Sequence, residues 1–390
     1  MGAIDHVRYL AETIGPRGST TPKEAEAARY AAEVLDRVGL KPTTEAFASA
    51  RSSYYPYALF AGLLLVGELF FWFAGGWGAA AALILGVVAL GSVLLELAFR
   101  PNPLRWILPK GSSQNVWARI EPSGEAREQI VLLGHLDSHR TPLLFSTDSW
   151  LRLFKTLVPL GLVSAVILII VFLIGTFALT TSLRLLSLPF TLVILAVLVL
   201  TLQADYSPYT AGANDNATGA GIVFSLAERL KAQPLAHTAV WAMLSGCEEV
   251  GCYGAEAFAQ EHWRELGRAV WVTLESAGGR GATVGYLTQE TFLLTSRSDP
   301  QLLALAEGIA KRRPDLDACA HSFQGAYTEG AIGAKYGLRV FTLLGFNRGG
   351  QLPGWHRPTD VMENLDQAVL EHGEEFMWEM LGEIDRQMPG

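Results

Sequence analysis

The chain has few cysteines, few charged residues and no excess of basic side chains. Its 390 residues include three cysteines, an odd number without paired spacing, which excludes a scaffold built on disulfides. The net charge of −8 excludes a basic surface of the kind that nucleic acids require, so we expect no nucleic-acid partner. Residues 1–8 lack the apolar core of a signal peptide, and we expect this segment to stay in the cytoplasm.

Hydrophobic residues are abundant, at 50% of the chain against 17% charged residues. This composition is too apolar for an ordinary soluble enzyme and too polar for a chain that lies entirely within a membrane. The apolar residues gather in four runs, at 57–74, 79–99, 156–179 and 186–202. Because about 20 helical residues span the roughly 30 Å hydrocarbon core, the runs predict two transmembrane helical hairpins, 57–99 and 156–202.

Basic residues near the ends of the runs predict an orientation. Those on the side of the polar segments are Arg51, Arg100, Arg105, Lys110, Arg152 and Lys155. Arg184 alone lies at a hairpin tip. By the positive-inside rule, we expect a multi-pass integral membrane protein whose polar segments are cytoplasmic.

Two glutamates and three glycines stand out in the first hairpin. Glu68 lies in the middle of one run and Glu96 near the end of the next. An intramembrane carboxylate indicates a functional site by default, but a protonated or interhelically hydrogen-bonded glutamate explains them equally well, and both interpretations stay open. Gly62, Gly67 and Gly86 are compatible with helix packing in a homodimer.

The polar segments alternate predicted helices and strands and are long enough for one large α/β domain. This discontinuous domain comprises residues 1–56, 100–155 and 203–390. Segments 115–121 and 129–134 read as strands joined by a turn-rich stretch, and we expect them to pair as an antiparallel hairpin. The start of the first strand would then adjoin the end of the second.

Acidic and imidazole side chains stand at or near the ends of predicted strands. They are His135, Asp137, Asp215, Glu248, Glu249, Glu275 and His356. A single histidine at a strand end is more often structural, and paired glutamates usually form a solvated face. Together, however, they form the kind of ligand set that a metal pair requires, at strand ends where open α/β sheets place their ligand sites.

Four motifs in this order resemble metallopeptidase family 28, the dizinc aminopeptidase group that also includes glutamate carboxypeptidases and glutaminyl cyclases. They are His135-Leu-Asp137, Gly212-Ala-Asn-Asp-Asn-Ala-Thr-Gly219, Glu248-Glu-Val-Gly-Cys-Tyr-Gly254 and Trp355-His-Arg-Pro-Thr-Asp360. The resemblance covers nearly all of the polar sequence. It implies a zinc-aminopeptidase-like phosphorylase/hydrolase fold, an α/β fold with a mixed, mostly parallel sheet between helices, and two Zn²⁺ per chain.

The resemblance also implies roles for the matched residues. The implied zinc ligands are His135, Asp215, Glu249, Glu275 and His356. Asp215 would bridge the two ions, and Asp137 would orient the imidazole of His135. Glu248 would act as the general base for hydrolysis by a zinc-bound hydroxide.

The sequence departs from the family pattern at three places. Glu275 stands where the family more often has aspartate, and Asn214 stands where an acidic residue is common. The interval of 80 residues between His135 and Asp215 is several times the family's usual one, because the second hairpin lies between them. The longer side chain of Glu275 could alter how it holds a metal.

Four further residues outside the proposed ligand set are candidates for structural or binding roles. Cys247 and Cys252 flank the glutamate pair, and we expect buried free thiols rather than a redox switch or a zinc–thiolate site. Tyr327 and Glu329 lie in a loop that could line the pocket, so we expect them to contact substrate.

We therefore expect a membrane-anchored dizinc aminopeptidase that hydrolyses N-terminal peptide bonds. Its partners would be the lipid bilayer and peptide or amide substrates presented at the membrane surface, which the active site would face. A carboxypeptidase, a dipeptidase or another amide hydrolase remains open, and a glutaminyl cyclase is less favoured. The alternatives outside this class are a catalytically inactive membrane receptor or scaffold, and a transporter with a fused soluble domain.

Overall fold

The computed structural model describes residues 1–387, which form two compact units. The first, the α/β unit, comprises Met1–Arg51, Lys110–His139 and the described residues from Tyr209 onward. The second, the helical unit, comprises Ser52–Pro109 and Arg140–Pro208.

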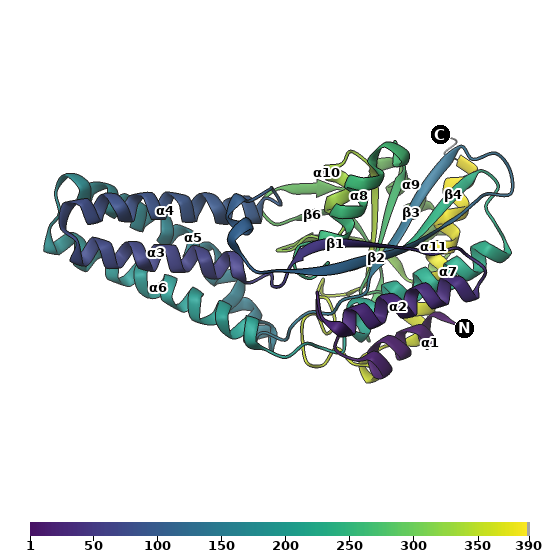
Figure 1. Cartoon of the computed structure of the whole chain (residues 1–390). Coiled ribbons are helices and arrows are strands. Elements are labelled where there is room, and N and C mark those ends of the chain that lie inside the picture. The colour runs from purple at the N-terminus through teal and green to yellow at the C-terminus, as the bar shows by residue number, and fades with distance from the viewer. Residues whose placement is uncertain (388–390) are drawn as a thin grey trace. The chain divides into compact units, whose positions relative to one another are not determined.

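The α/β unit is built on one sheet whose strands follow the order β1-β2-β4-β3-β5-β9-β6-β10, with β7 and β8 paired to β6 (Figure 1). The strands are β1 (Thr43–Ala50), β2 (Lys110–Ile120), β3 (Glu128–His135), β4 (Thr238–Ser245), β5 (Val270–Glu275), β6 (Ala282–Thr291), β7 (Thr295–Arg297), β8 (Ala318–Gln324), β9 (Arg339–Leu344) and β10 (Phe346–Asn347). The central strands β4, β3, β5 and β9 are parallel, while β1, β2 and β6 run antiparallel to their neighbours on this path. This confirms the predicted α/β fold with a mixed, mostly parallel sheet.

The expected antiparallel hairpin of segments 115–121 and 129–134 is wrong. β4 lies between β2 and β3, antiparallel to the first and parallel to the second. The loop that joins β2 to β3 crosses the chain entering β4, and its Ser123 and Gly124 N–H groups donate to the carbonyl oxygens of Leu235 and Ala236. β2 still runs opposite to β3, so the start of β2 and the end of β3 lie at the same end of the sheet.

Helices cover both faces of this sheet (Figure 1). On one face lie α1 (Ala3–Arg8), α2 (Pro22–Arg37), α7 (Gly219–Ala232), α9 (Pro300–Arg312) and α11 (Gln367–Gln387), which pack aliphatic side chains onto the strands. On the other face lie α8 (Tyr253–Leu266) and α10 (Gly330–Lys335). There Trp117, Trp241 and Phe258 form an aromatic layer. The ring centroid of Trp241 lies 4.9 Å from that of Trp117 and 5.7 Å from that of Phe258.

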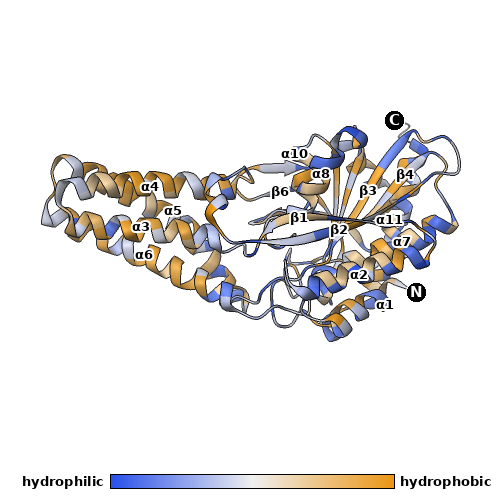
Figure 2. Ribbon diagram, viewed as in Figure 1, coloured by the Kyte–Doolittle hydropathy of each residue, from blue (hydrophilic) through white to orange (hydrophobic). Residues whose placement is uncertain are grey.

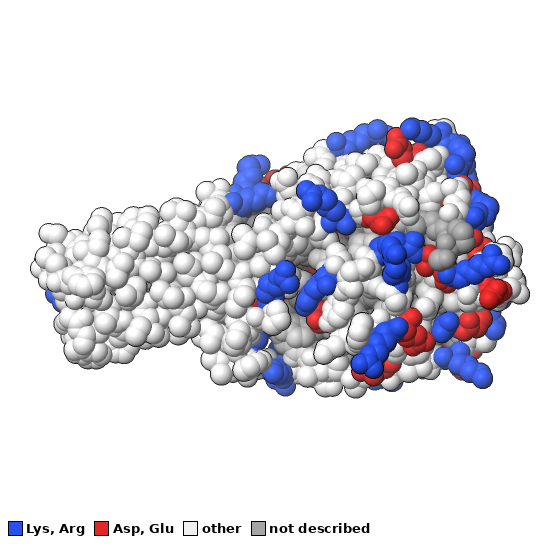
Figure 3. Space-filling model, turned by 90° about the horizontal axis from the view of Figure 1, so that it is seen from above, with Lys and Arg blue, Asp and Glu red and all other residues white. Residues whose placement is uncertain are grey.

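The helical unit contains four long helices, α3 (Tyr55–Phe73), α4 (Gly75–Leu97), α5 (Asp148–Phe177) and α6 (Thr181–Tyr206). All four are long and apolar enough to cross a membrane. Figure 2 shows hydrophobic residues along their whole length, and Figure 3 shows almost no charged side chains on the face of this unit that is visible. In length and composition the four helices are those that the apolar runs predict.

Polar residues and glycines join the helices within this unit. Glu68 of α3 accepts hydrogen bonds at Oε1 from Trp72 Nε1, at 2.7 Å, and from the Ser187 hydroxyl of α6. This contact favours the interhelical hydrogen-bonding interpretation of Glu68. A Cβ on Gly67 would lie 3.3 Å from Ala82 of α4, and one on Gly86 would lie 2.8 Å from the side chain of Ile169 of α5, so both glycines pack inside the unit.

Glu96 also has a structural partner in the helical unit. Its carboxylate accepts from Arg105 Nε at 2.8 Å and from the Asn102 side chain at 2.6 Å. These contacts hold the segment that follows α4 against the end of that helix.

Each insertion interrupts the α/β unit at a place where the segments before and after it are already in contact. Ala50 lies opposite Lys110 in the β1–β2 ladder, on either side of the first insertion. His139 and Thr210, on either side of the second, are joined by a hydrogen bond from the Thr210 N–H to the His139 carbonyl oxygen, at 2.9 Å. Both insertions therefore leave the sheet at the carboxyl end of its parallel strands.

Candidate metal centre

Three neighbouring parallel strands carry acidic and imidazole residues at their carboxyl ends. His135 is the last residue of β3, and Glu275 is the last residue of β5. Glu248 and Glu249 lie in the loop that follows β4, whose Ser245 is level with His135 in the ladder. Because parallel strands end at one edge, the sheet alone brings these four side chains together.

Asp215 lies between two imidazoles. It belongs to the turn η4 (Ala213–Thr218) before α7, and the peptide bond from Asp215 to Asn216 is cis. Its Oδ1 is 3.4 Å from His135 Nε2, and its Oδ2 is 3.6 Å from His356 Nε2. The two carboxylate oxygens therefore face in two directions, as a bridging ligand requires.

Each imidazole faces a second carboxylate. His135 Nε2 is 3.1 Å from Glu275 Oε1, and His356 Nε2 is 3.3 Å from Glu249 Oε2. Donor atoms within 4.8 Å of one another form three groups that could hold a metal ion: His135, Asp215 and Glu275; His135, Glu248 and Glu249; and His139, Glu249 and His356. The structure thus brings together all five residues predicted as ligands, and adds His139.

Unsatisfied carboxylate oxygens show that this cluster suits cations. Among the described residues, Glu249 Oε1 and Glu275 Oε2 are buried without a hydrogen-bond partner. Burial raises the pKa of both carboxyl groups well above the usual value, and nearby carboxylates such as Asp215 add to the effect. Since buried unpaired anions are costly and imidazole with carboxylate is a common zinc donor set, the residues fit divalent zinc.

The two imidazoles differ in their proton affinity. Burial opposes a charge on His135, but the carboxylates of Glu275, Asp137 and Asp215 outweigh it and raise the pKa of His135. Burial and the charge of His139 lower the pKa of His356. The surroundings of His135 thus favour its protonated form, whereas those of His356 favour its neutral form.

Asp137 orients both His135 and the glutamate loop. Its Oδ1 is 3.3 Å from His135 Nδ1 and accepts from the Glu248 N–H at 3.0 Å. Its Oδ2 accepts from the Ser19 hydroxyl at 2.6 Å and from the Glu249 N–H at 3.2 Å. The carboxylate thus ties the end of β3 to the loop after β4.

Glu248 has the environment of a proton acceptor. Its Oε2 lies 3.8 Å from His135 Nε2, at the edge of the cluster. Burial raises the pKa of Glu248 to about 8, and the negative charges of Glu329, Asp137 and Asp215 contribute, although His135 opposes them. A carboxylate with this proton affinity can exchange a proton with water near neutral pH.

Two buried residues that the sequence analysis did not assign support Asp215. Asp360 accepts from the N–H groups of Asn214 and Asp215, at 2.6 and 3.1 Å. Arg17 is fully buried and donates to the carbonyl oxygens of Leu136 and Gly212, at 2.6 and 2.7 Å. Asp360 closes the motif that contains His356, which was a usable signal, whereas no motif marked Arg17.

Left-handed backbone conformations gather around the cluster. Cys247, Cys252, Ser276 and His356 have φ angles of 55°, 54°, 45° and 53°. Such angles are uncommon for residues other than glycine, and they concentrate at functional sites. Here they lie at a ligand or close beside one.

The remaining predicted residues have mixed surroundings. Glu329 is fully buried, and burial raises its pKa to about 7. The Tyr327 hydroxyl accepts from the Leu294 N–H at 2.9 Å, at the turn between β6 and β7. A substrate-binding role for both stays a prediction.

The cysteines beside the glutamate pair are free and buried, as expected. Burial raises the pKa of both thiols. Cys252 Sγ donates to Glu248 Oε1 at 3.2 Å, so this thiol helps to hold the carboxyl group of Glu248.

Comparison with known proteins supports a class for this site. Residues 196–381 match the model of peptidase family M28, a range that excludes His135 and Asp137. No curated protein sequence matches the chain. The family match supports a hydrolase that acts on peptides.

Solved structures share the fold at low sequence identity. A leucine aminopeptidase precursor from Bacteroides thetaiotaomicron is 14% identical with a TM-score of 0.58, over 98% of this chain and 96% of that one. BSAP, a zinc aminopeptidase from Bacillus subtilis, is 12% identical with a TM-score of 0.58, over 98% and 94%. A Bacteroides thetaiotaomicron glutaminyl cyclase is 12% identical with a TM-score of 0.57, over 98% and 96%.

Proposed function

We propose that the chain is a membrane-anchored dizinc aminopeptidase of family M28 that hydrolyses N-terminal peptide bonds. One observation carries this proposal: the two oxygens of Asp215 face two separate imidazole–carboxylate pairs, at 3.4 and 3.6 Å from the imidazole nitrogens. His135 with Glu275 would hold one ion, and His356 with Glu249 the other. A shared carboxylate between two such pairs is an arrangement that two ions need and one ion does not.

The chain's own residues supply proton transfer and orientation. When bound, the zinc ions supply Lewis acidity and lower the pKa of water at the site. Glu248 Oε2 takes the proton of the attacking water and passes it to the leaving amine, which its raised pKa permits near neutrality. Asp137 holds the Glu248 backbone and the His135 ring in fixed positions while this proton moves.

The preference for N-terminal bonds rests on buried negative charge beside the base. Glu329 is buried, and its negative charge contributes to the raised pKa of Glu248. The carboxylate of Glu329 therefore acts electrostatically on the site. A free α-ammonium group would pair with such a carboxylate through a charge-assisted hydrogen bond. Tyr327 would line the same pocket.

We further propose that the four apolar helices span a bilayer and anchor the α/β unit to it, and that the α/β unit lies in the cytoplasm. Both insertions leave the sheet at the carboxyl end of the parallel strands, the end that carries His135 and Glu275. This supports substrates presented at the membrane surface. The basic residues on the α/β side of the apolar runs support the cytoplasmic orientation.

The activity test uses the full-length protein in detergent, loaded with zinc. Glu248→Gln should lower the hydrolysis of aminoacyl arylamides by about 10²–10⁴-fold while leaving the zinc content unchanged, because Glu248 moves a proton and is not a ligand. Glu261→Gln on the exposed side of α8 is the matched control and should keep full activity.

Three outcomes of this assay would reject the proposal. The first is a Glu248→Gln variant with undiminished activity. The second is equal cleavage of free and N-acetylated peptides, which would indicate an endopeptidase or a carboxypeptidase. The third is cyclisation of N-terminal glutamine without peptide hydrolysis, the activity that the name of one solved neighbour carries.

A further inference from the structure

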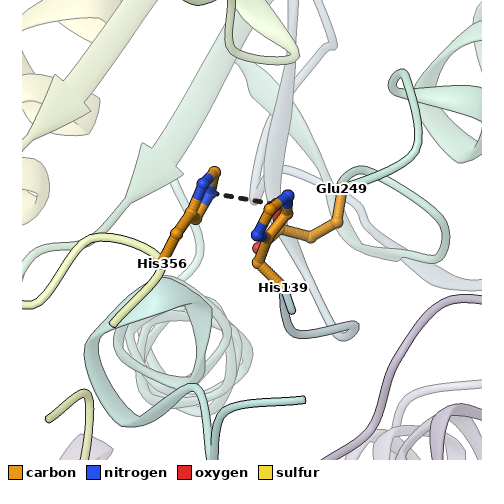
Figure 4. Close-up of side chains that lie close together, drawn as sticks. All are labelled: His139, Glu249 and His356. Atoms are coloured by element: carbon orange, nitrogen blue, oxygen red, sulfur yellow. Dashed lines mark ion pairs between the residues drawn. The ribbon is translucent and has the colours of Figure 1, made fainter. Parts of the chain in front are cut away.

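His139 lies beside the proposed second zinc site and has no role in the function proposed above. It follows β3 by four residues and is buried, with a relative exposure of 7%. Its ring stacks on the ring of His356, with centroids 3.4 Å apart and planes inclined by 12° (Figure 4). Glu249 reaches the same place from the loop after β4 (Figure 4).

The stacked geometry argues against both histidines as ligands of one ion. An imidazole binds metal along the lone pair in its ring plane, at about 2.0–2.1 Å for zinc. The two rings are nearly parallel and stacked, with centroids 3.4 Å apart, so a single ion close to both rings cannot lie in both ring planes. One ring therefore binds and the other supports it, although both nitrogens lie within 4.8 Å of the Glu249 carboxylate.

Distances identify His356 as the ring that binds. Its Nε2 is 3.3 Å from Glu249 Oε2 and 3.6 Å from Asp215 Oδ2, so this atom faces two carboxylates of the cluster at once. His139 covers the flat face of that ring.

His356 lies in a turn, and two rings pack against its imidazole. It lies between β10 and α11, outside any helix or strand, and its φ of 53° is a strained conformation for a residue other than glycine. Trp355 packs against the same ring, with centroids 4.6 Å apart. The rings of His139 and Trp355 thus limit the rotation of this imidazole.

His139 is itself firmly held. Its carbonyl oxygen accepts from the Thr210 N–H at 2.9 Å. The preceding Ser138 hydroxyl donates to the Thr210 carbonyl oxygen at 2.9 Å and accepts from the Arg17 N–H at 3.1 Å. These hydrogen bonds hold the backbone at His139 and at the residue before it, and so hold the stacking ring in place.

We propose that His139 is a positioning residue whose ring, stacked on His356, fixes the plane of that imidazole and so sets the affinity for the ion held by Glu249 and His356. The inference rests on the proposed two-ion site. It concerns the flat ring of His139 and not its nitrogen atoms, which makes it testable with an aromatic residue that cannot bind metal.

The test measures the two zinc dissociation constants of the full-length protein by chelator competition. His139→Phe keeps a flat ring without a donor atom and should bind the ion held by Glu249 and His356 with an affinity within about 3-fold of wild type. His139→Leu has similar bulk without a flat ring and should lower the affinity for that ion by about 10–100-fold. This is the usual effect of losing a residue that orients a ligand. The visible spectrum of the cobalt-loaded protein should be unchanged in the Phe variant and altered in the Leu variant.

Two results would overturn the inference. Equal loss of affinity in both variants, with both cobalt spectra altered, would make His139 a ligand through its nitrogen. Wild-type affinity in both variants would leave the ring without a role. Thermal unfolding of the metal-free variants checks folding, and wild-type protein that binds fewer than two ions would refute the proposed function rather than this inference.

Discussion

At the scale of single residues, the site is a concentration of negative charge with few cations to balance it. The carboxylates of Asp215, Glu249 and Glu275 face two imidazoles, and the buried Arg17 supports the turn behind them. Two oxygens of this set are buried without partners among residues 1–387. The metal-free protein therefore holds protons where the metal-bound protein would hold cations.

This charge balance predicts that zinc binding releases protons. Glu249 and Glu275 have raised pKa values because they are buried among other carboxylates, and the carboxylates around His135 raise its pKa. All three must lose a proton to act as ligands, so the affinity for zinc should fall as pH falls below neutrality. Calorimetry in buffers of different ionisation enthalpy measures the protons released.

A binding enthalpy that is the same in every buffer would contradict this account. The Glu248→Gln variant is a useful comparison, because Glu248 is not a ligand in the proposal. Any proton that this residue releases should be missing from the variant, while the release from the ligands should persist.

At the scale of elements, close backbone contacts set the positions of the ligands. The N-terminus of α7 touches the strand ends: a Cβ on Gly219 would lie 2.2 Å from the Leu274 carbonyl oxygen and 2.4 Å from Asn216 Oδ1. Asn216 in turn accepts from the Gly219 and Ser276 N–H groups. A single side-chain carbon at Gly219 would push α7 away from β5.

We predict that Gly219→Ala destabilises the protein and weakens zinc binding. Overpacking of this kind typically costs about 1–3 kcal/mol, and here it also separates Asp215 from Glu275. Gly308→Ala is the control, because Gly308 lies within α9 and a Cβ there would meet only the end of the Arg312 side chain, at 3.4 Å. Thermal unfolding and zinc titration of both variants measure the effect, and equal behaviour would show that the α7–β5 contact is loose.

The sequence predicted the elements with strong local signals and missed those without them. The four apolar runs were recognised because their signal is local. β6 and β8 were missed because segments 282–291 and 318–324 show neither a long apolar run nor strict alternation of apolar and polar residues. The order of β2, β4 and β3 depends on long-range pairing, which adjacency in the chain does not reveal.

The residues of the site also divide into those that a local sequence pattern marks and those that only long-range contacts bring together. Four of the five expected ligands lie in the motifs, Glu275 stands at the end of a predicted strand, and the structure brings all five close together. Asp360 accepts from the Asp215 N–H, and Arg17 donates to the Gly212 carbonyl oxygen. Both contacts join segments that lie far apart in the chain. His139 was passed over because its stacking partner, His356, is more than two hundred residues away in the chain.

At the scale of the whole molecule, the α/β unit has its own core and closes around both insertions. Ala50 with Lys110, and His139 with Thr210, are already in contact across the places where the chain leaves and returns. The fold of this unit therefore requires no residue of the helical unit to join its ends.

We predict that the α/β unit folds alone when Ser52–Pro109 and Arg140–Pro208 are each replaced by a short Gly/Ser linker. The product should stay in solution without detergent, bind zinc and cleave soluble arylamides, but lose its preference for peptides presented on lipid vesicles. Aggregation on removal of detergent, or loss of zinc binding, would show that the helical unit is part of the fold rather than an anchor. Replacement of one segment at a time assigns the effect.

The central claim is that one carboxylate joins two zinc ions, and zinc content per chain tests it most directly. Full-length protein is loaded with zinc, dialysed and analysed by mass spectrometry of the metal, together with Asp215→Ala, Glu275→Ala and His356→Ala variants. The account predicts two ions in the wild type, one in each of the Glu275 and His356 variants, and loss of both from the Asp215 variant. A wild-type protein with a single ion, or an Asp215→Ala variant that keeps two, would contradict it.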